Sequence, residues 1–342
     1  MGLIDSVTKE YMSSNRRFAD VYNYFLYGGK QVIAEEDLRE QDTTELFNLL
    51  DKSGTMTANQ QFRDVLKQTV VKTDGQLYYL LMGIENQSEI HYAMPVKNQL
   101  YDAINYATQV SKQSKIHRAK KDLRGAEFLS GFSKEDRIIP IVTLTILWNS
   151  GKWDGPKSLH EMMALKKPEL LQYVPDYKLN LVVPEEIEAY GDFKTELGAV
   201  LEFLSVKDDG ARLSNLLAKK PETYSNMDID SAKVLKVCAN LDIDMSYRTK
   251  DGGVDMCKGI IEIREAGRAE GLEKGRAEGI AEGIAEGIAE GRAEGIVQGK
   301  KAVAIKMYQS DRNLKLEFLA DMVEESIETV KEWILSAGIQ LR

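Results

Sequence analysis

Two acidic residues and a glutamine stand at the ends of two strand-like runs, in a pattern that suits a divalent cation. Asp64 lies near the start of one run. Glu85 and Gln87 lie at the end of the next, two positions apart and so on one strand face. Adjacent carboxylates repel each other on a sheet, and a bound cation removes that cost because hard ions take carboxylate oxygens as ligands. The residue types predict a Mg²⁺ or Mn²⁺ site made by Asp64 and Glu85, with Gln87 beside it.

A β-hairpin is the element that must bring the acids together. The runs Phe62–Lys72 and Gln76–Asn86 flank Asp74-Gly75, and Asp-Gly between β-rich runs is typical of a two-residue type I′ turn. Counting back from that turn places Asp64 directly opposite Glu85. One bulge would move Asp64 to the other face, so a polar strand end with solvated acids is the alternative interpretation.

The sequence around the hairpin resembles a known nuclease family. The resemblance is carried by LLMGIENQSEIHYAMPVKNQLYDAINYA and EFLSGFSKEDRIIPIVTL, and it covers about Phe18 to Pro184. These segments look like the recombination-promoting nuclease family of bacteria, which is also labelled transposase-related and has the PD-(D/E)XK fold. Its most specific part here is Glu85-Asn86-Gln87-Ser88 with its flanks. A glycine-repeat tail is also common in that family.

The resemblance implies a metal-dependent DNA endonuclease linked to recombination or mobile elements. It implies Asp64, Glu85 and Gln87 as catalytic residues and Mg²⁺ or Mn²⁺ as the cofactor. It also puts Asp20, on the first helix, near the metal, and the alternative for Asp20 is a solvated helix acid. No DDE triad is apparent in the sequence, so transposase chemistry is not expected.

The glutamine is a departure from the superfamily, which has lysine at that position. Gln87 can orient a water by hydrogen bonding, but it supplies no positive charge. That departure leaves open whether one or two metal ions take part. Lys67 and Lys97 are possible substitutes, although the predicted register puts neither on the Asp64 face.

One basic segment is a candidate for contacts with DNA phosphates. It follows the predicted helix Tyr92–Ser114 and is rich in lysine and arginine, which hold phosphates without reading sequence. A solvated helix end is the alternative. The candidate residues are Lys112, Lys115, Arg118, Lys120, Lys121 and Arg124.

Composition narrows the class of protein. The net charge of −9 over 342 residues argues against a protein that coats nucleic acid nonspecifically, but it leaves a nuclease possible. Two cysteines without CxxC spacing indicate a reducing cytosol, and three histidines give no zinc cluster. No signal peptide opens the chain, and the longest apolar run, Ile138–Trp148, is too short to span a bilayer. We therefore expect a bacterial cytoplasmic protein with no membrane partner.

The order of predicted elements indicates an α/β fold. A helix over Arg16–Leu26 precedes the hairpin, and a helix over Tyr92–Ser114 follows it. The later elements are expected at Ile138–Trp148 (strand), Lys157–Gln172 (helix) and Lys178–Val183 (strand). This order fits a PD-(D/E)XK restriction-endonuclease-like core over residues 1–184, with a helical domain over 185–262.

The C-terminal part is dominated by a four-residue repeat. Ala and Glu favour helix, whereas each interior glycine costs about 0.5–1 kcal/mol against alanine. We expect a helical stalk over 263–300 that forms a homo-oligomer by close backbone approach, and a single helix or a tether is the alternative. Residues 301–342 are expected to form a small cap of two helices broken near Glu325-Ser326. The repeat glycines are at 267, 271, 275, 279, 283, 287, 291, 295 and 299.

A second class of function also fits the sequence. The chain could be a non-catalytic DNA-binding or assembly protein on a decayed nuclease core, organised by the glycine-repeat stalk. The intact Asp64, Glu85 and Gln87 argue against decay, whereas the acidic balance argues against strong DNA affinity. Metal binding and DNA cleavage separate the two interpretations.

Overall fold

The computed structural model describes residues 2–41, 64–73, 76–164, 167–246 and 248–341. It falls into two units, Met1–Ile263 and Arg264–Arg342. The predicted Asp74-Gly75 turn and the start of the first hairpin strand at Phe62 lie outside the described residues.

A five-stranded mixed sheet is the centre of the first unit, so the chain has an α/β fold as predicted. The strand order follows the sequence: β1 (Arg39–Glu40), β2 (Val65–Thr73), β3 (Gln76–Gln87), β4 (Ile141–Leu147) and β5 (Asn180–Val182). Strands β1, β2 and β3 pair antiparallel, whereas β3, β4 and β5 pair parallel. The parallel step from β3 to β4 requires a crossover, which the long helix α4 supplies.

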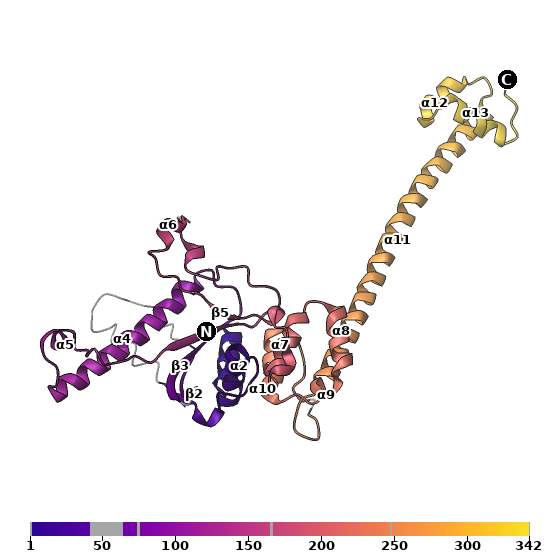
Figure 1. Cartoon of the computed structure of the whole chain (residues 1–342). Coiled ribbons are helices and arrows are strands. Elements are labelled where there is room, and N and C mark those ends of the chain that lie inside the picture. Colours follow the sequence, from indigo (N-terminus) through magenta and orange to yellow (C-terminus); the bar gives the residue numbers. More distant parts are fainter. Residues whose placement is uncertain (1, 42–63, 74–75, 165–166, 247, 342) are drawn as a thin grey trace. The chain divides into compact units, whose positions relative to one another are not determined.

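Helices α1 (Leu3–Ser13) and α2 (Asn15–Tyr27) pack on one face of the sheet (Figure 1). The hydroxyl of Tyr22 donates to the backbone oxygens of Gly83 and Val142, which ties α2 to β3 and β4. Helix α2 ends at Gly28, whose positive φ of 59° is the left-handed conformation that closes a helix. The predicted helix over Arg16–Leu26 is confirmed.

Helix α4 (Met94–Lys120) packs on the opposite face through polar contacts. Asn98 donates to the hydroxyl of Thr145 at 2.9 Å, and the hydroxyl of Thr143 donates to Asp102 at 2.8 Å. Pro95 lies in the first turn, where its missing N–H costs nothing. The helix runs six residues beyond the predicted end at Ser114, so most of the basic segment is helical.

The strands after α4 match the sequence prediction better than the helix between them. Strands β4 and β5 lie inside the predicted runs. The prediction of one helix over Lys157–Gln172 is wrong for the described residues there, which form a 3₁₀ turn and the single-turn helix α6 (Pro168–Leu171). Pro168 begins α6 because proline has no N–H to continue a preceding helix.

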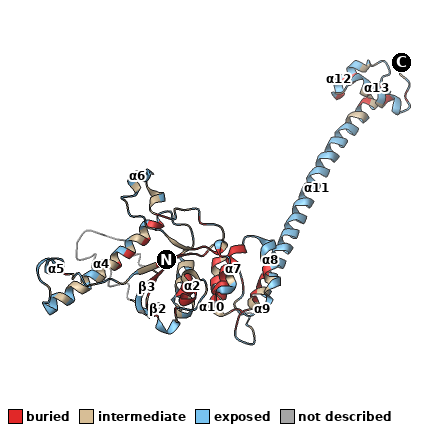
Figure 2. Ribbon diagram, in the orientation of Figure 1, coloured by how far each residue is buried: buried red, intermediate tan, exposed pale blue. Residues whose placement is uncertain are grey.

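Residues 185–262 share a hydrophobic core with the sheet and α1, rather than forming a separate domain. This region contains α7 (Leu197–Val206), α8 (Gly210–Lys219), α9 (Pro221–Tyr224) and α10 (Ile229–Cys238). Tyr11 of α1 is buried edge-on to Trp148 and lies 2.8 Å from the Ser231 hydroxyl of α10. Figure 2 shows the buried positions of α2, α7 and α10 that belong to this one core.

Helix α11 (Met256–Ser310) is continuous over 55 residues and carries the whole glycine repeat on exposed positions (Figure 2). It is followed by α12 (Leu316–Val323) and α13 (Ile327–Ser336), which close a small core around Tyr308. Ser326 caps α13 by accepting from the Thr329 N–H, so the predicted break near residues 325–326 is confirmed. Among the described residues, no helix combines the length and the apolar character needed to cross a membrane.

Candidate metal centre

The hairpin register places Asp64 across from Glu85, as the sequence predicted. The ladder pairs Thr73 with Gln76 at one end and Val65 with Ile84 at the other. Asp64 is the next residue before Val65, and its Oδ2 accepts a 2.8 Å hydrogen bond from the backbone N–H of Asn86. This bond holds the Asp64 carboxylate at the carboxyl end of β3.

Lys97 of α4 contacts Glu85 and forms, with Asp64 and Glu85, a cluster of three charged residues. The two side chains form an ion pair with 2.9 Å between Lys97 Nζ and Glu85 Oε2. The Glu85 side chain is only 1% exposed, so the charge on Lys97 stabilises a carboxylate that is almost removed from water. The expectation that Lys97 lies away from the Asp64 face is wrong. Helix α4 packs over that face of the sheet, and its first turn places Lys97 next to Glu85.

Burial and the nearby cation act on Asp64 in opposite directions. Burial raises the pKa of Asp64 above its ordinary value, while the Asn86 N–H and the charges of Lys97 and Lys9 oppose that rise. The charged form of Asp64 is therefore less favourable in the folded protein than in water. A cation bound between Asp64 and Glu85 reduces that cost.

Lys67 is excluded from the cluster, in agreement with the sequence prediction for that residue. It points to the opposite face of the sheet, where Nζ donates to the backbone oxygen of Ser13 and to Asn15 Oδ1. The ammonium also lies over the ring of Phe18. Burial lowers the pKa of Lys67, and its role is to join β2 to helices α1 and α2.

Gln87 lies two residues beyond Glu85 on β3, half-buried at the last position of the strand. Its amide nitrogen donates to the backbone oxygen of Asn86 at 2.9 Å. Gln87 therefore places a neutral amide at the carboxyl end of β3, near Asp64 and Glu85. Lys97, in contact with Glu85, brings a positive charge to this end of the sheet.

Asp20 does not join the carboxylate pair, which corrects the expectation drawn from the resemblance. It is buried at 2% exposure, and its oxygens accept from the backbone N–H groups of Lys194 and Thr195 and from the Thr195 hydroxyl. These donors precede α7, where unpaired N–H groups attract an anion. Asp20 therefore fixes α2 to the chain entering α7.

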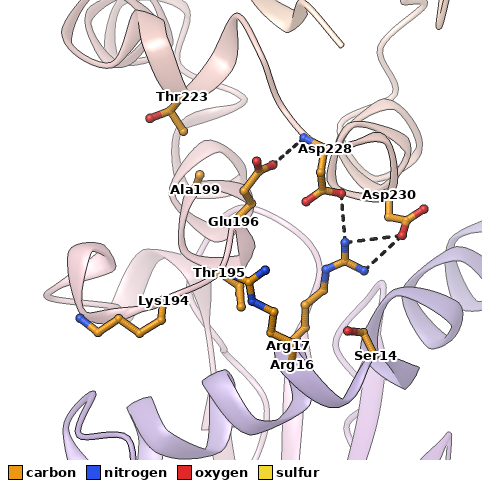
Figure 3. Close-up of a pocket in the computed structure, with 10 residues that line it drawn as sticks. All are labelled: Ser14, Arg16, Arg17, Lys194, Thr195, Glu196, Ala199, Thr223, Asp228 and Asp230. Atoms are coloured by element: carbon orange, nitrogen blue, oxygen red, sulfur yellow. Dashed lines mark hydrogen bonds and ion pairs between the residues drawn. The ribbon is translucent and has the colours of Figure 1, made fainter. Parts of the chain in front are cut away.

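The same region contains a charged pocket of about 590 Å³, drawn in Figure 3. In that view the Arg17 guanidinium points toward Asp228 and Asp230, at 3.0 and 3.4 Å. Glu196 accepts the Asp228 N–H at 2.8 Å, and burial raises the pKa of Glu196 to about 7. Asp228 keeps a lowered pKa because Ser231 donates to it and Arg17 is close. These charges join α2 to α7 and α10.

The candidate DNA-binding residues are all exposed. Lys112, Lys115, Arg118 and Lys120 belong to the last turns of α4. Lys121 follows as the left-handed residue that ends the helix, and Arg124 precedes α5 (Gly125–Ser130). Helix α4 carries them away from the sheet toward α5 (Figure 1). The residues are Lys112, Lys115, Arg118, Lys120, Lys121 and Arg124.

The possible metal ligands at this strand end are two carboxylates, those of Asp64 and Glu85. Within the described ranges, no group of three or more His, Cys, Asp or Glu side chains could hold a metal. Magnesium is commonly bound by one or two carboxylates, with waters and substrate phosphates as its other ligands. Asp64 and Glu85 would hold the ion, and the two cysteines, Cys238 and Cys257, are free thiols elsewhere.

Comparison with known proteins gives no independent information about the candidate metal centre. No family model, no curated protein and no solved structure matches the chain.

Proposed function

We propose that the protein is a metal-dependent DNA endonuclease built on a PD-(D/E)XK-like core and linked to recombination or mobile elements. One observation carries the proposal: Lys97 contacts the buried Glu85 at the strand end where Asp64 is also held. Two acids and a lysine at the end of the central strands suit phosphodiester hydrolysis. The helix–hairpin–helix–strand order supports the same core.

Four residues have separate roles in the proposed hydrolysis. Asp64 and Glu85 would hold Mg²⁺ or Mn²⁺, which when bound polarises the scissile phosphate and lowers the pKa of the attacking water. Lys97 supplies the positive charge that Gln87 lacks and stabilises negative charge developing on the phosphate. Gln87 orients a water by hydrogen bonding.

Plasmid cleavage tests the proposal. Wild type is compared with Asp64→Ala, Glu85→Ala and Lys97→Ala in magnesium, manganese, calcium and EDTA. We expect cleavage by wild type in magnesium or manganese, none in EDTA, and a loss of at least about 100-fold in each variant. Lys67→Ala tests whether the loss is specific, since Lys67 is a lysine of the same sheet whose side chain lies on the other face.

Three results would count against the proposal. Equal cleavage by all proteins would indicate a contaminant or another site. Metal binding that is the same in wild type and Asp64→Ala, measured by calorimetry, would show that the carboxylate pair is not the metal site. DNA binding without cleavage by folded, metal-bound wild type would favour the non-catalytic assembly protein instead.

A further inference from the structure

Helix α4 joins the candidate metal centre to the basic segment along one continuous rod (Figure 1). Lys97 lies in its first turn, and Lys115 lies eighteen residues later, which is about five full turns of an α-helix. Lys115 therefore projects from the same side of the helix as Lys97. Lys112 and Arg118 are three residues to either side of Lys115 and flank it on that side.

This side of α4 is free of acidic residues. The only acid between Met94 and Lys120 is Asp102, which is 8% exposed and bonded to the hydroxyls of Thr143 and Tyr177. The intervening positions on the Lys97 side are Tyr101, Ile104, Thr108 and Ser111. A polyanion lying along this side meets positive charges of α4 at both ends and no carboxylate of α4 on that side between them.

The far end of α4 also differs from the rest of the chain in net charge. Residues 110–138, which we name the basic arm, contain eight lysines and arginines against four acids, in a chain of net charge −9. Two of those acids, Asp122 and Asp136, contact His117 within the arm, at 2.8 and 2.9 Å. The positive charges at the arm surface are therefore only partly offset.

A hollow of about 340 Å³ lies at the end of the arm, with Arg118, Lys121 and Phe128 in its wall. Arg118 and Lys121 are exposed cations, and Phe128 is 67% exposed. Such a wall suits a phosphate flanked by a sugar, because the cations bind the phosphate oxygens and the ring covers the apolar face of the sugar.

The distance between the two ends matches a repeat of double-stranded DNA. Twenty-one residues separate Arg118 from Lys97, about 32 Å along the helix axis. One turn of B-form DNA is about 34–36 Å. Phosphates one turn apart on a strand face the same side of the duplex, so one straight helix can reach both.

We propose that α4 acts as a ruler: duplex DNA lies along its Lys97 side, and Lys115, Arg118 and Lys121 bind phosphates about one helical turn from the bond that is cut. The proposal rests on the proposed nuclease function for the position of the cut. It adds that the substrate is double-stranded and must extend about one turn to one side of the candidate metal centre.

Binding to blunt duplexes of about 6 to about 24 base pairs tests the ruler, with fluorescence anisotropy in calcium as the readout. The affinity of wild type is expected to rise by a step once the duplex spans about one turn. The variant Lys115→Ala/Arg118→Ala should lose that step, and the slope of log affinity against log salt should fall by about 2. The control Arg212→Ala/Lys219→Ala removes the same charges from the exposed surface of α8 and should keep both properties.

The outcomes distinguish the proposed role of α4 in duplex binding from the proposed nuclease activity. A length step that the Lys115→Ala/Arg118→Ala variant retains, or no step in wild type, would overturn the ruler even if wild type cleaves plasmid. A step that depends on Lys115 and Arg118, with no cleavage in magnesium, would support the ruler and reject the nuclease. Equal affinity for single strands and duplexes of the same length would also overturn the ruler.

Discussion

Lys97 Nζ lies 2.9 Å from Oε2 of Glu85, a carboxylate with almost no exposure to water. A buried ion pair is expensive to break, because removing one partner leaves the other charge buried alone. Lys97 and Glu85 therefore couple the stability of the fold to the chemistry of the candidate metal centre.

Lys97→Met should destabilise the metal-free protein by about 3 kcal/mol, because Glu85 then lacks its cation. Urea unfolding in EDTA measures this loss. Lys97→Arg keeps the charge and should cost much less. The double variant Lys97→Met/Glu85→Gln should recover most of the loss, and a double variant as unstable as Lys97→Met alone would contradict the coupling.

Asp64→Asn should stabilise the metal-free protein at neutral and higher pH. Burial raises the pKa of Asp64 in the folded state, so its favourable contribution is present below its ordinary value of 3.8 and is lost as pH rises through the folded value. The neutral amide avoids that loss, and we expect a gain of roughly 1 kcal/mol at pH 8 that disappears near pH 3. Manganese should raise the melting temperature of wild type and leave the variant unchanged.

Glu196 should make stability depend on pH near neutrality. Burial raises its pKa from 4.5 to about 7, so the stabilising contribution is complete below about pH 4.5 and is lost as pH rises through about 7. The groups that face it are Asp228, with a lowered pKa, and Arg17. Because Glu196 is only half-buried, we expect Glu196→Gln to raise the melting temperature by only a few degrees at pH 8 relative to pH 5. Equal gains at the two pH values would contradict this assignment.

Helix α11 should self-associate through its glycine repeat. In one chain, no described atom outside the neighbouring backbone lies within 4 Å of a Cβ added at any repeat glycine. For an isolated helix, Gly279→Ala, Gly283→Ala and Gly287→Ala would therefore each add about 0.5–1 kcal/mol of helix stability without a clash. If helices approach closely at these glycines, the same triple variant should dissociate the oligomer.

Sedimentation of the full chain distinguishes the two possibilities for α11. We expect wild type to sediment as an oligomer and the triple glycine variant as a monomer with at least the same helix content. The control variant Glu278→Gln/Glu282→Gln/Glu286→Gln alters exposed side chains of the same turns and should leave the oligomer intact. A monomeric wild type would contradict self-association.

The sequence by itself determined the features that depend on local periodicity and turn chemistry. Alternation along two runs around Asp74-Gly75 predicted the register that sets Asp64 opposite Glu85, and the ladder confirms it. The helix before Gly28 and the break before Ser326 also follow from residues close in the chain. Each of these features is decided within a few residues, so no distant partner is needed to predict it.

Tertiary structure decided which distant groups meet these local elements. Lys97 reaches Glu85 only because α4 crosses back over the sheet, and strand register alone carries no information about that crossing. Asp20 is held by backbone N–H groups 174 and 175 residues away, which no spacing in the sequence reveals. The packing of α1 against α10 through Tyr11 and Ser231 spans 220 residues, because a buried core is assembled from surfaces that chain order does not specify.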